Sequence, residues 1–253
     1  MGILYIVSSG PGAIEYLTPR ARAALEESEY IIGNRFYLEY LKDLIDGKEV
    51  IFSSMGAEVQ RAQRAAELAR DHIVSMVSGG DAGVYGMASI VLEVLENGGY
   101  DGMVEVIPGV TAATMAASRL GSPLSGDYVT LSLSDLLTPW DVIEKRLELA
   151  FQMEVPVALY NPKSRGRPHN LGKALGILSR YRSEDTPIGI VKNASRHGEE
   201  VYVTTLAELA DNDDLVDMHS IVIIGGAESR VWQVGGDVCG IITPRGYHNK
   251  YKY

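Results

Sequence analysis

The chain has 253 residues, of which 46% are hydrophobic and 22% charged, a composition typical of a globular protein with one large core or two smaller ones. Its formal net charge of −10 argues against nucleic acid as a partner, because binding that polyanion depends on lysines and arginines that neutralise phosphates. A single cysteine, Cys239, excludes a disulfide framework or a multi-cysteine metal site built from this chain alone. No segment approaches the ~20 apolar residues of a membrane span, and no signal-peptide pattern is present, so a cytoplasmic location is expected.

The first half of the chain is predicted to alternate short strands with helices. Residues 3–7 form an apolar run that ends at the turn residues Gly10-Pro11-Gly12, which predicts a strand followed by a tight loop. Thr18 suits the N-cap and Pro19 the first position of the helix that follows. The same rhythm predicts strands at 30–33, 50–52, 72–78 and 104–107 and helices at 35–45, 57–70, 85–96 and 111–120. This alternation favours a parallel α/β layer.

The pattern changes after residues 121–126, a segment of small residues and a proline. We therefore expect two α/β domains, an N-terminal domain of residues 1–123 and a C-terminal domain of residues 124–253. The second domain is predicted to be mixed α/β, with strands at 128–133, 155–160, 188–191 and 221–224 and helices at 140–153, 170–181 and 206–212.

Four segments rich in glycine or serine follow predicted strands, at residues 9–12, 78–86, 108–112 and 132–138. In open α/β sheets ligands bind beyond the carboxyl ends of the strands, where loop backbone approaches them closely. Any one of these loops alone is equally typical of an ordinary tight turn. Their recurrence indicates a ligand site built from several loops.

Several common types of site are not indicated. The first loop lacks the Gly-x-Gly-x-x-Gly pattern of a dinucleotide site, and there is no phosphate loop ending in Gly-Lys-Ser/Thr. The motifs His-Glu-x-x-His and Gly-x-Ser-x-Gly are also absent. Hydride transfer, phosphoryl transfer and serine hydrolysis therefore lose their usual support in the sequence.

Three of the loops carry a resemblance to a known family. Residues 10–12 (Gly-Pro-Gly), 78–87 (Ser-Gly-Gly-Asp-Ala-Gly-Val-Tyr-Gly-Met) and 106–112 (Val-Ile-Pro-Gly-Val-Thr-Ala) resemble the successive motifs of the tetrapyrrole (corrin/porphyrin) methylases. Residues 131–140, 160–165 and 242–248 resemble the branch of that family that methylates C(17) of precorrin-3B or cobalt-factor III. Many relatives have glycine where Ser8 stands and proline where Ala82 stands, and the alanine fits the C(17) branch.

The resemblance implies two α/β domains with S-adenosylmethionine in the cleft between them, and a homodimer. It places the substrate trough and part of the cofactor site in the N-terminal domain and the rest of the cofactor site in the C-terminal domain. It implies methylation of C(17) of an anionic tetrapyrrole, with or without cobalt, and ring contraction, in cobalamin biosynthesis. The remaining alternatives are a methyltransferase for another corrinoid position, an enzyme of the same fold that modifies a protein or ribosomal RNA, and a non-catalytic module that binds a corrinoid or an adenosine ligand. Because the accepting carbon of a reduced tetrapyrrole is already electron-rich, we expect positioning of the reactants to contribute more than any single base.

The resemblance also implies roles for particular residues. The expected cofactor-binding residues are Pro11, Gly79, Gly80, Asp81, Val84, Tyr85, Thr111, Ala112, Tyr160, Asn193, Ala194 and Thr243. Asp81, Ser132, Ser134, Asp135 and His248 are candidates for the proton transfers of ring contraction, with loop capping or an exposed tail as the alternative for each. The expected substrate-binding residues are Gly10, Pro11, Asp135, Lys163, Arg165 and Arg167. No metal site of the chain's own is expected, although His169, His197 or His248 are candidates for an axial ligand to a substrate cobalt.

Overall fold

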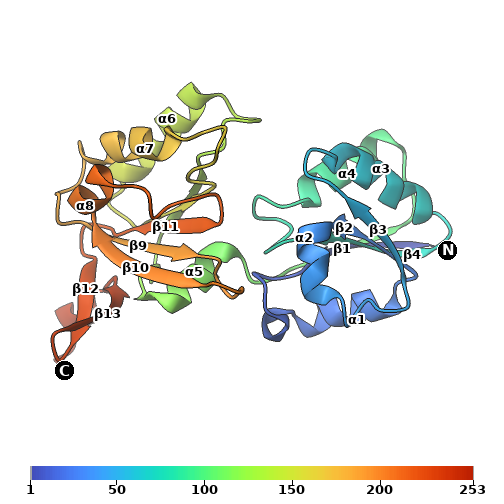
Figure 1. Cartoon of the computed structure of the whole chain (residues 1–253), viewed down its shortest axis with the longest axis horizontal. Coiled ribbons are helices and arrows are strands. Elements are labelled where there is room, and N and C mark those ends of the chain that lie inside the picture. Colours follow the sequence, from blue (N-terminus) through green and yellow to red (C-terminus); the bar gives the residue numbers. More distant parts are fainter. Residues whose placement is uncertain (1, 253) are drawn as a thin grey trace. The chain divides into compact units, whose positions relative to one another are not determined.

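The computed structural model describes residues 2–252 and divides into two compact units, Met1–Ala112 and Ala113–Tyr253 (Figure 1). This division lies N-terminal to the boundary expected after residue 123. The intervening residues belong to the second unit because Leu120 packs against its sheet, where a Cβ on Gly189 would lie 2.3 Å from the Leu120 side chain. Among residues 2–252, no helix is both long and apolar enough to cross a membrane.

The first unit is built on a five-stranded parallel sheet with the strand order β3-β2-β4-β1-β5. The strands are β1 (Ile3–Ser8), β2 (Tyr30–Asn34), β3 (Glu49–Ser53), β4 (Ile73–Ser78) and β5 (Met103–Ile107). The prediction of a parallel α/β layer is thereby confirmed. Because all five strands run the same way, their carboxyl ends and the loops that follow them meet at one edge.

Helices cover both faces of this sheet (Figure 1). The helices are α1 (Pro19–Glu27), α2 (Arg35–Leu38), α3 (Glu58–Leu68) and α4 (Ala88–Asn97). The chain moves toward β3 after β1 and β2 and back toward β5 after β3 and β4, so right-handed crossovers place α1 and α2 on one face and α3 and α4 on the other. Two separate cores result, one centred on Leu25 and Val7 under α1 and α2, and one on Ala65 and Met76 under α3 and α4.

The helix ends follow local sequence signals. The Thr18 hydroxyl caps α1 by accepting a hydrogen bond from the N–H of Ala21 at 3.2 Å, as predicted. The helix predicted at 35–45 is instead the single turn α2 followed by a 3₁₀ turn, Glu39–Leu41, although Leu38, Leu41 and Ile45 are buried with helical spacing. The helix predicted from residue 85 begins only at Ala88, because Tyr85 has a left-handed backbone conformation with φ of 52°.

The second unit contains a mixed five-stranded sheet with the order β10-β9-β11-β8-β7. Its strands are β7 (Val129–Ser132), β8 (Val157–Tyr160), β9 (Pro187–Lys192), β10 (Glu200–Thr205) and β11 (Ser220–Ile224). Strands β7 and β8 are parallel, whereas β11 runs antiparallel to both β8 and β9. The mixed α/β prediction is confirmed, and β10 is an addition that the sequence analysis missed.

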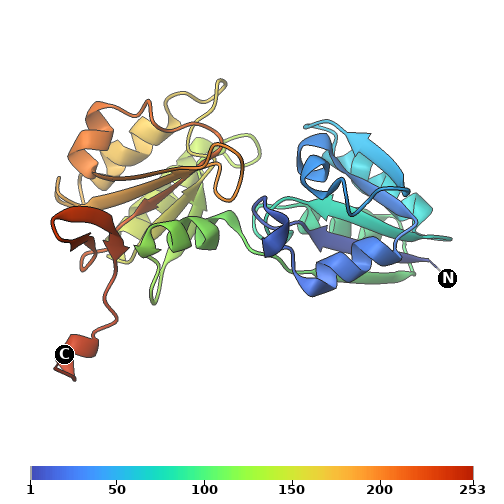
Figure 2. The same ribbon diagram turned by 60° about the horizontal axis from the view of Figure 1, so that its bottom comes forward.

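Helices and a small second sheet complete this unit. The helices are α5 (Ala112–Arg119), α6 (Trp140–Gln152), α7 (Asn170–Leu178) and α8 (Leu206–Asp211). The side chains of α6, α7 and α8 pack on the five-stranded sheet around Phe151. The strands β12 (Arg230–Val234) and β13 (Asp237–Ile242) form a hairpin that pairs with the short β6 (Gly121–Ser122), and the chain continues from it to the C-terminal turn (Figure 2).

Candidate functional site

Three glycine-containing loops meet at the carboxyl edge of the first unit's sheet. Gly10, after β1, and Gly80, after β4, form a two-way backbone bridge in which each N–H donates to the other carbonyl, at 3.0 and 2.8 Å. The third loop, after β5, approaches so closely that a Cβ on Gly109 would lie 2.5 Å from the Cβ of Ser8 and 2.8 Å from the Gly80 carbonyl oxygen. The prediction that the strand-end loops converge is confirmed for these three, whereas the fourth predicted loop, residues 132–138, belongs to the second unit.

Serine side chains at the strand ends fix the second loop. The buried hydroxyl of Ser8 accepts a hydrogen bond from the N–H of Ala82 at 2.8 Å. The hydroxyl of Ser78 accepts one from the N–H of Met87 at 3.2 Å. Ser8 therefore joins the first loop to the second through its side chain.

Asp81 joins the second loop to the third. One carboxylate oxygen accepts from the N–H of Gly83 at 2.8 Å, closing a local turn, and the other accepts from the N–H of Gly109 at 2.8 Å. Both carboxylate oxygens are thus engaged with backbone. The structure gives Asp81 a positioning role in the loops, beside the cofactor and proton-transfer roles expected from the sequence.

The remaining expected cofactor residues of the first unit belong to the same loops. Val84 closes the turn that Asp81 begins, its N–H donating to the Asp81 carbonyl at 3.2 Å, and the exposed Tyr85 follows it. The Cα of Thr111 and the backbone N of Ala112 lie 3.9 and 4.0 Å from the position that a Cβ on Gly80 would take.

Two residues of this edge were missed by the sequence analysis. The ring of Tyr37 packs on Gly79, where an added Cβ would lie 2.2 Å from the ring. Arg61 on α3 is buried, with a side chain that is 3% exposed, and its nearest carboxylate oxygen, from Glu58, is 3.5 Å away. Its Nε has no hydrogen-bond partner within residues 2–252, and burial lowers the pKa of the guanidinium. The polar pattern around Arg61 indicated a surface helix and gave no signal of this burial.

The second unit also gathers its polar loops at one sheet edge, because β7, β8 and β9 all run toward it. The Ser132 hydroxyl accepts hydrogen bonds from the Asn161 side-chain amide at 3.0 Å and from the N–H of Ser134 at 3.2 Å. Arg167 donates to the Ser134 hydroxyl at 2.5 Å and lies 4.0 Å from the Asp135 carboxylate. The structure therefore brings together four of the residues predicted from the sequence: Ser132, Ser134, Asp135 and Arg167.

The basic loop after β8 borders a cavity of about 710 Å³. Lys163 is paired with the Asp213 carboxylate at 2.5 Å, so its charge is already matched within the unit. Arg165 is exposed at the cavity and has no ion-pair partner in the described part of the chain. Of the basic residues predicted to bind substrate, Arg165 is therefore the one whose charge is most available to an external carboxylate.

The other predicted residues of the second unit are engaged in its own structure. The Tyr160 hydroxyl accepts from the N–H of Ala113 at 2.9 Å, and the Thr243 hydroxyl donates to the Pro123 carbonyl at 2.5 Å. Asn193 has φ of 50° and is followed by the buried Ala194 in the loop after β9. His248 lies in an exposed 3₁₀ turn, Tyr247–Asn249, outside these strand-end loops. Within residues 2–252, no group of three or more His, Cys, Asp or Glu side chains is arranged to hold a metal ion.

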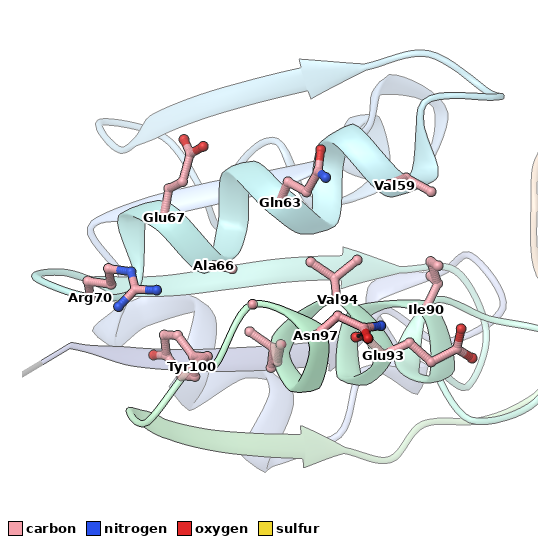
Figure 3. A pocket seen from close by; sticks show the side chains of 12 residues that line it. Val59, Gln63, Ala66, Glu67, Arg70, Ile90, Glu93, Val94, Asn97 and Tyr100 are labelled. Atoms are coloured by element: carbon pink, nitrogen blue, oxygen red, sulfur yellow. Dashed lines mark hydrogen bonds between the residues drawn. The ribbon is translucent and has the colours of Figure 1, made fainter.

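A separate groove of about 720 Å³ lies between α3 and α4 (Figure 3). Gln63 and Glu67 of α3 and Glu93, Val94 and Asn97 of α4 are among the residues that line it. None of the glycine-loop residues lines this groove. It is therefore distinct from the loop site at the carboxyl edge.

These features define a class of two-unit α/β proteins whose strand-end loops are held together by their own side chains. The chain belongs to the Tetrapyrrole (Corrin/Porphyrin) Methylases, whose family model matches residues 3–210.

Two curated relatives show how far the similarity extends. Cobalamin biosynthesis protein CbiHC of Archaeoglobus fulgidus is 45% identical over 99% of this chain, and the chain spans about half of that relative's length, 54%. The probable cobalt-factor III C(17)-methyltransferase of Salmonella typhimurium is 43% identical, with 97% of this chain and 99% of the relative covered.

Solved structures of related proteins have the same fold. The crystal structure of the methyltransferase CobJ matches with a TM-score of 0.88 and 32% identity, over 96% of this chain and all of the other. Uroporphyrin-III C-methyl transferase from Thermus thermophilus, complexed with S-adenyl homocysteine, matches with a TM-score of 0.69 and 25% identity over 88% of this chain and 92% of the other. The expected fold class, two α/β domains of the tetrapyrrole methylase type, is confirmed.

Proposed function

We propose that this chain transfers a methyl group from S-adenosylmethionine to C(17) of cobalt-factor III or precorrin-3B, with contraction of the macrocycle, in cobalamin biosynthesis. The observation that carries the proposal is the end-to-end similarity to the Salmonella relative, which includes the loops after β7 and β8 as well as the shared glycine loops. The glycine loops resemble motifs of the family as a whole, whereas residues 131–140 and 160–165 resemble the C(17) branch, so the loops of the second unit support the choice of C(17).

The glycine loops fit a cofactor held mainly by backbone. Ser8 and Asp81 are occupied in joining the loops, so the groups that remain for a ligand are largely backbone N–H and C=O groups. S-adenosylmethionine supplies an activated methyl group on a sulfonium. The chain's residues contribute by holding the reactants in line, and a well-oriented reaction gains roughly 7–11 kcal/mol from such positioning.

The polar loops of the second unit supply candidates for substrate binding and proton transfer. Arg165 binds a substrate carboxylate in this proposal, because its charge is not matched within the unit. Ser134, held by Arg167, and Ser132, held by Asn161, are oriented hydroxyls that can relay a proton during ring contraction.

The proposed setting is a cytoplasmic homodimer that binds neither membrane nor nucleic acid. The net charge of −10 supports the last point, because a phosphate backbone repels an acidic chain. Sedimentation velocity at micromolar protein concentration tests the dimer.

The decisive experiment offers the purified chain S-adenosylmethionine with cobalt-factor III or precorrin-3B, in parallel anaerobic reactions followed by mass spectrometry. We expect the tetrapyrrole to gain one methyl group. The substrate that reacts faster shows whether the enzyme prefers a cobalt-containing or a metal-free tetrapyrrole. S-adenosylhomocysteine as a product separates a methyltransferase from a module that only binds these ligands. Binding of the cofactor without methylation of either tetrapyrrole would refute the C(17) assignment.

A matched pair of glycine variants tests the cofactor site. Gly109→Ala places a methyl 2.8 Å from the Gly80 carbonyl oxygen, whereas Gly176→Ala, in α7, meets no atom within 4 Å. We expect Gly109→Ala to weaken S-adenosylhomocysteine binding at least tenfold in calorimetry and Gly176→Ala to leave it unchanged. Equal affinities of the two variants for S-adenosylhomocysteine would show that the third loop is not part of the cofactor site.

A further inference from the structure

The loop after β7 presents two adjacent leucines to solvent. The side chains of Leu136 and Leu137 are 79% and 93% exposed, more than any other large hydrophobic side chain in residues 2–252. Single exposed leucines are ordinary on protein surfaces, but an adjacent pair this exposed, between polar residues, indicates a contact with a further apolar group. We call residues 135–138 the leucine loop.

The two ends of the leucine loop are fixed, whereas its tip is not. Before the loop, the buried side chain of Asn170 donates a hydrogen bond to the Leu133 carbonyl at 2.8 Å. After the loop, helix α6 begins at Trp140. Within residues 2–252, no hydrogen bond involves the backbone of residues 135–137. The tip is therefore a short flap between two anchored ends, and it can move without breaking the fold.

The leucine loop is joined to the turn that carries the unmatched cation of this unit. Ser164 and Arg167 close this turn by two backbone hydrogen bonds, at 3.0 and 3.3 Å, with Arg165 between them. The Arg167 side chain donates to the Ser134 hydroxyl at 2.5 Å and lies 4.0 Å from the Asp135 carboxylate. One arginine side chain thus ties the position of Arg165 to the base of the leucine loop.

This combination of groups selects the kind of ligand. A pair of leucines alone suits any apolar surface, and an unmatched arginine alone suits any carboxylate. A tetrapyrrole has broad apolar faces and a rim of carboxylates, so it satisfies both groups at once. A ligand without an apolar face leaves both leucines in water, and a ligand without carboxylates leaves Arg165 unused.

We propose that Leu136 and Leu137 form an apolar lid that closes on a ring face of the tetrapyrrole while Arg165 pairs with a carboxylate of its rim. The inference rests on the proposed function and adds to it a closing element that belongs to the second unit. Closure covers the hydroxyls of Ser132 and Ser134 and excludes bulk water from them during proton transfer.

The test measures binding of uroporphyrin III, a stable tetrapyrrole polycarboxylate, by fluorescence titration of the full chain. We expect Leu136→Ala/Leu137→Ala to weaken binding at least about tenfold, because two leucines lose their apolar contact with the ligand. The thermal midpoint should not change, since side chains this exposed contribute little to the fold. The matched control is Leu149→Ala/Met153→Ala at the end of α6, where the side chains are 54% and 59% exposed, and it should bind like the unaltered chain.

Salt separates the apolar contact from the ionic one. In 1 M salt, where charges are screened within about 3 Å, the loss caused by Arg165→Met should shrink. The loss caused by Leu136→Ala/Leu137→Ala should persist, because burial of apolar surface does not depend on screened charges. A leucine effect that disappears in 1 M salt would contradict the lid, since the leucines would then act only through Arg165.

The outcomes also separate this inference from the proposed function. If the unaltered chain binds no tetrapyrrole at all, the proposed function fails and the lid fails with it. If the chain binds uroporphyrin III and the leucine variant binds equally well, only the lid is refuted. A lower sedimentation coefficient for the leucine variant at unchanged affinity would also refute it, because the leucines would then contact a second copy of the chain.

Discussion

Ser8→Ala isolates the hydrogen bond that joins the first two loops. The variant removes one oxygen atom from a fully buried side chain and leaves the N–H of Ala82, whose residue is also buried, without its acceptor. An unsatisfied buried donor costs about 1–3 kcal/mol, and a domain near the size of the first unit loses roughly 4–8 °C of midpoint per kcal/mol. We therefore expect the first unit's thermal transition to fall by about 4–24 °C.

The assay is thermal unfolding followed by circular dichroism, together with calorimetric titration of S-adenosylhomocysteine. Ser9→Ala is the matched control, because the Ser9 hydroxyl makes only a 3.5 Å contact with the Gly10 carbonyl, and we expect its midpoint to stay within about 2 °C of the unaltered chain. Cofactor affinity should fall with Ser8→Ala at temperatures where the unit is still folded, since the second loop loses one anchor. Equal midpoints for the two variants would show that the Ser8 hydroxyl does not hold the loop.

Three further predictions concern charged side chains of the first unit. Asp81→Asn keeps one oxygen acceptor and loses the other, so we expect a destabilisation of about 1–3 kcal/mol; full loss of methyl transfer at an unchanged midpoint would instead make Asp81 a proton-transfer residue. Arg61→Met removes a buried charge whose carboxylate neighbour remains solvated, so we expect an unchanged or higher thermal midpoint, and a fall of several degrees would contradict the view that the guanidinium is poorly satisfied. The hydrogen bond from Arg20 lowers the pKa of Glu105, so this pair stabilises the fold above the unfolded-state pKa and loses its contribution as the pH falls through the folded-state pKa. Because the Glu105 side chain is 42% exposed, the ion pair contributes at most about 1 kcal/mol to stability. Between pH 7 and pH 3, the thermal midpoint of Glu105→Gln should therefore fall less than that of the unaltered chain.

The strand–helix rhythm of the first unit was predictable because each signal is local. Alternating apolar runs and the Thr18-Pro19 cap indicate a strand and a helix without reference to distant residues. Parallel strands then require that all their carboxyl ends share one edge, so the convergence of the glycine loops followed from the fold class alone.

The features missed by the sequence analysis depend on tertiary contacts. From the sequence alone, Lys163 is indistinguishable from a basic surface residue. The fold pairs it with Asp213, which lies fifty positions later in the chain. Strand β10 has polar and half-exposed residues because it lies at the edge of its sheet, and such a strand shows no continuous apolar run. Arg61 is likewise buried although it lies among polar residues of α3.

In both units, side chains at the strand ends hold the neighbouring loops in place by hydrogen bonds. In the first unit, Ser8 and Asp81 accept hydrogen bonds from backbone N–H groups of neighbouring loops. In the second unit, Ser132 accepts a hydrogen bond from Asn161, and Ser134 accepts one from Arg167. A side chain so engaged is held in one orientation, and leaving that orientation costs free energy comparable to the bond. A rigid loop, in contrast, loses little entropy when it holds a ligand in line for transfer. The arrangement therefore favours catalysis by positioning.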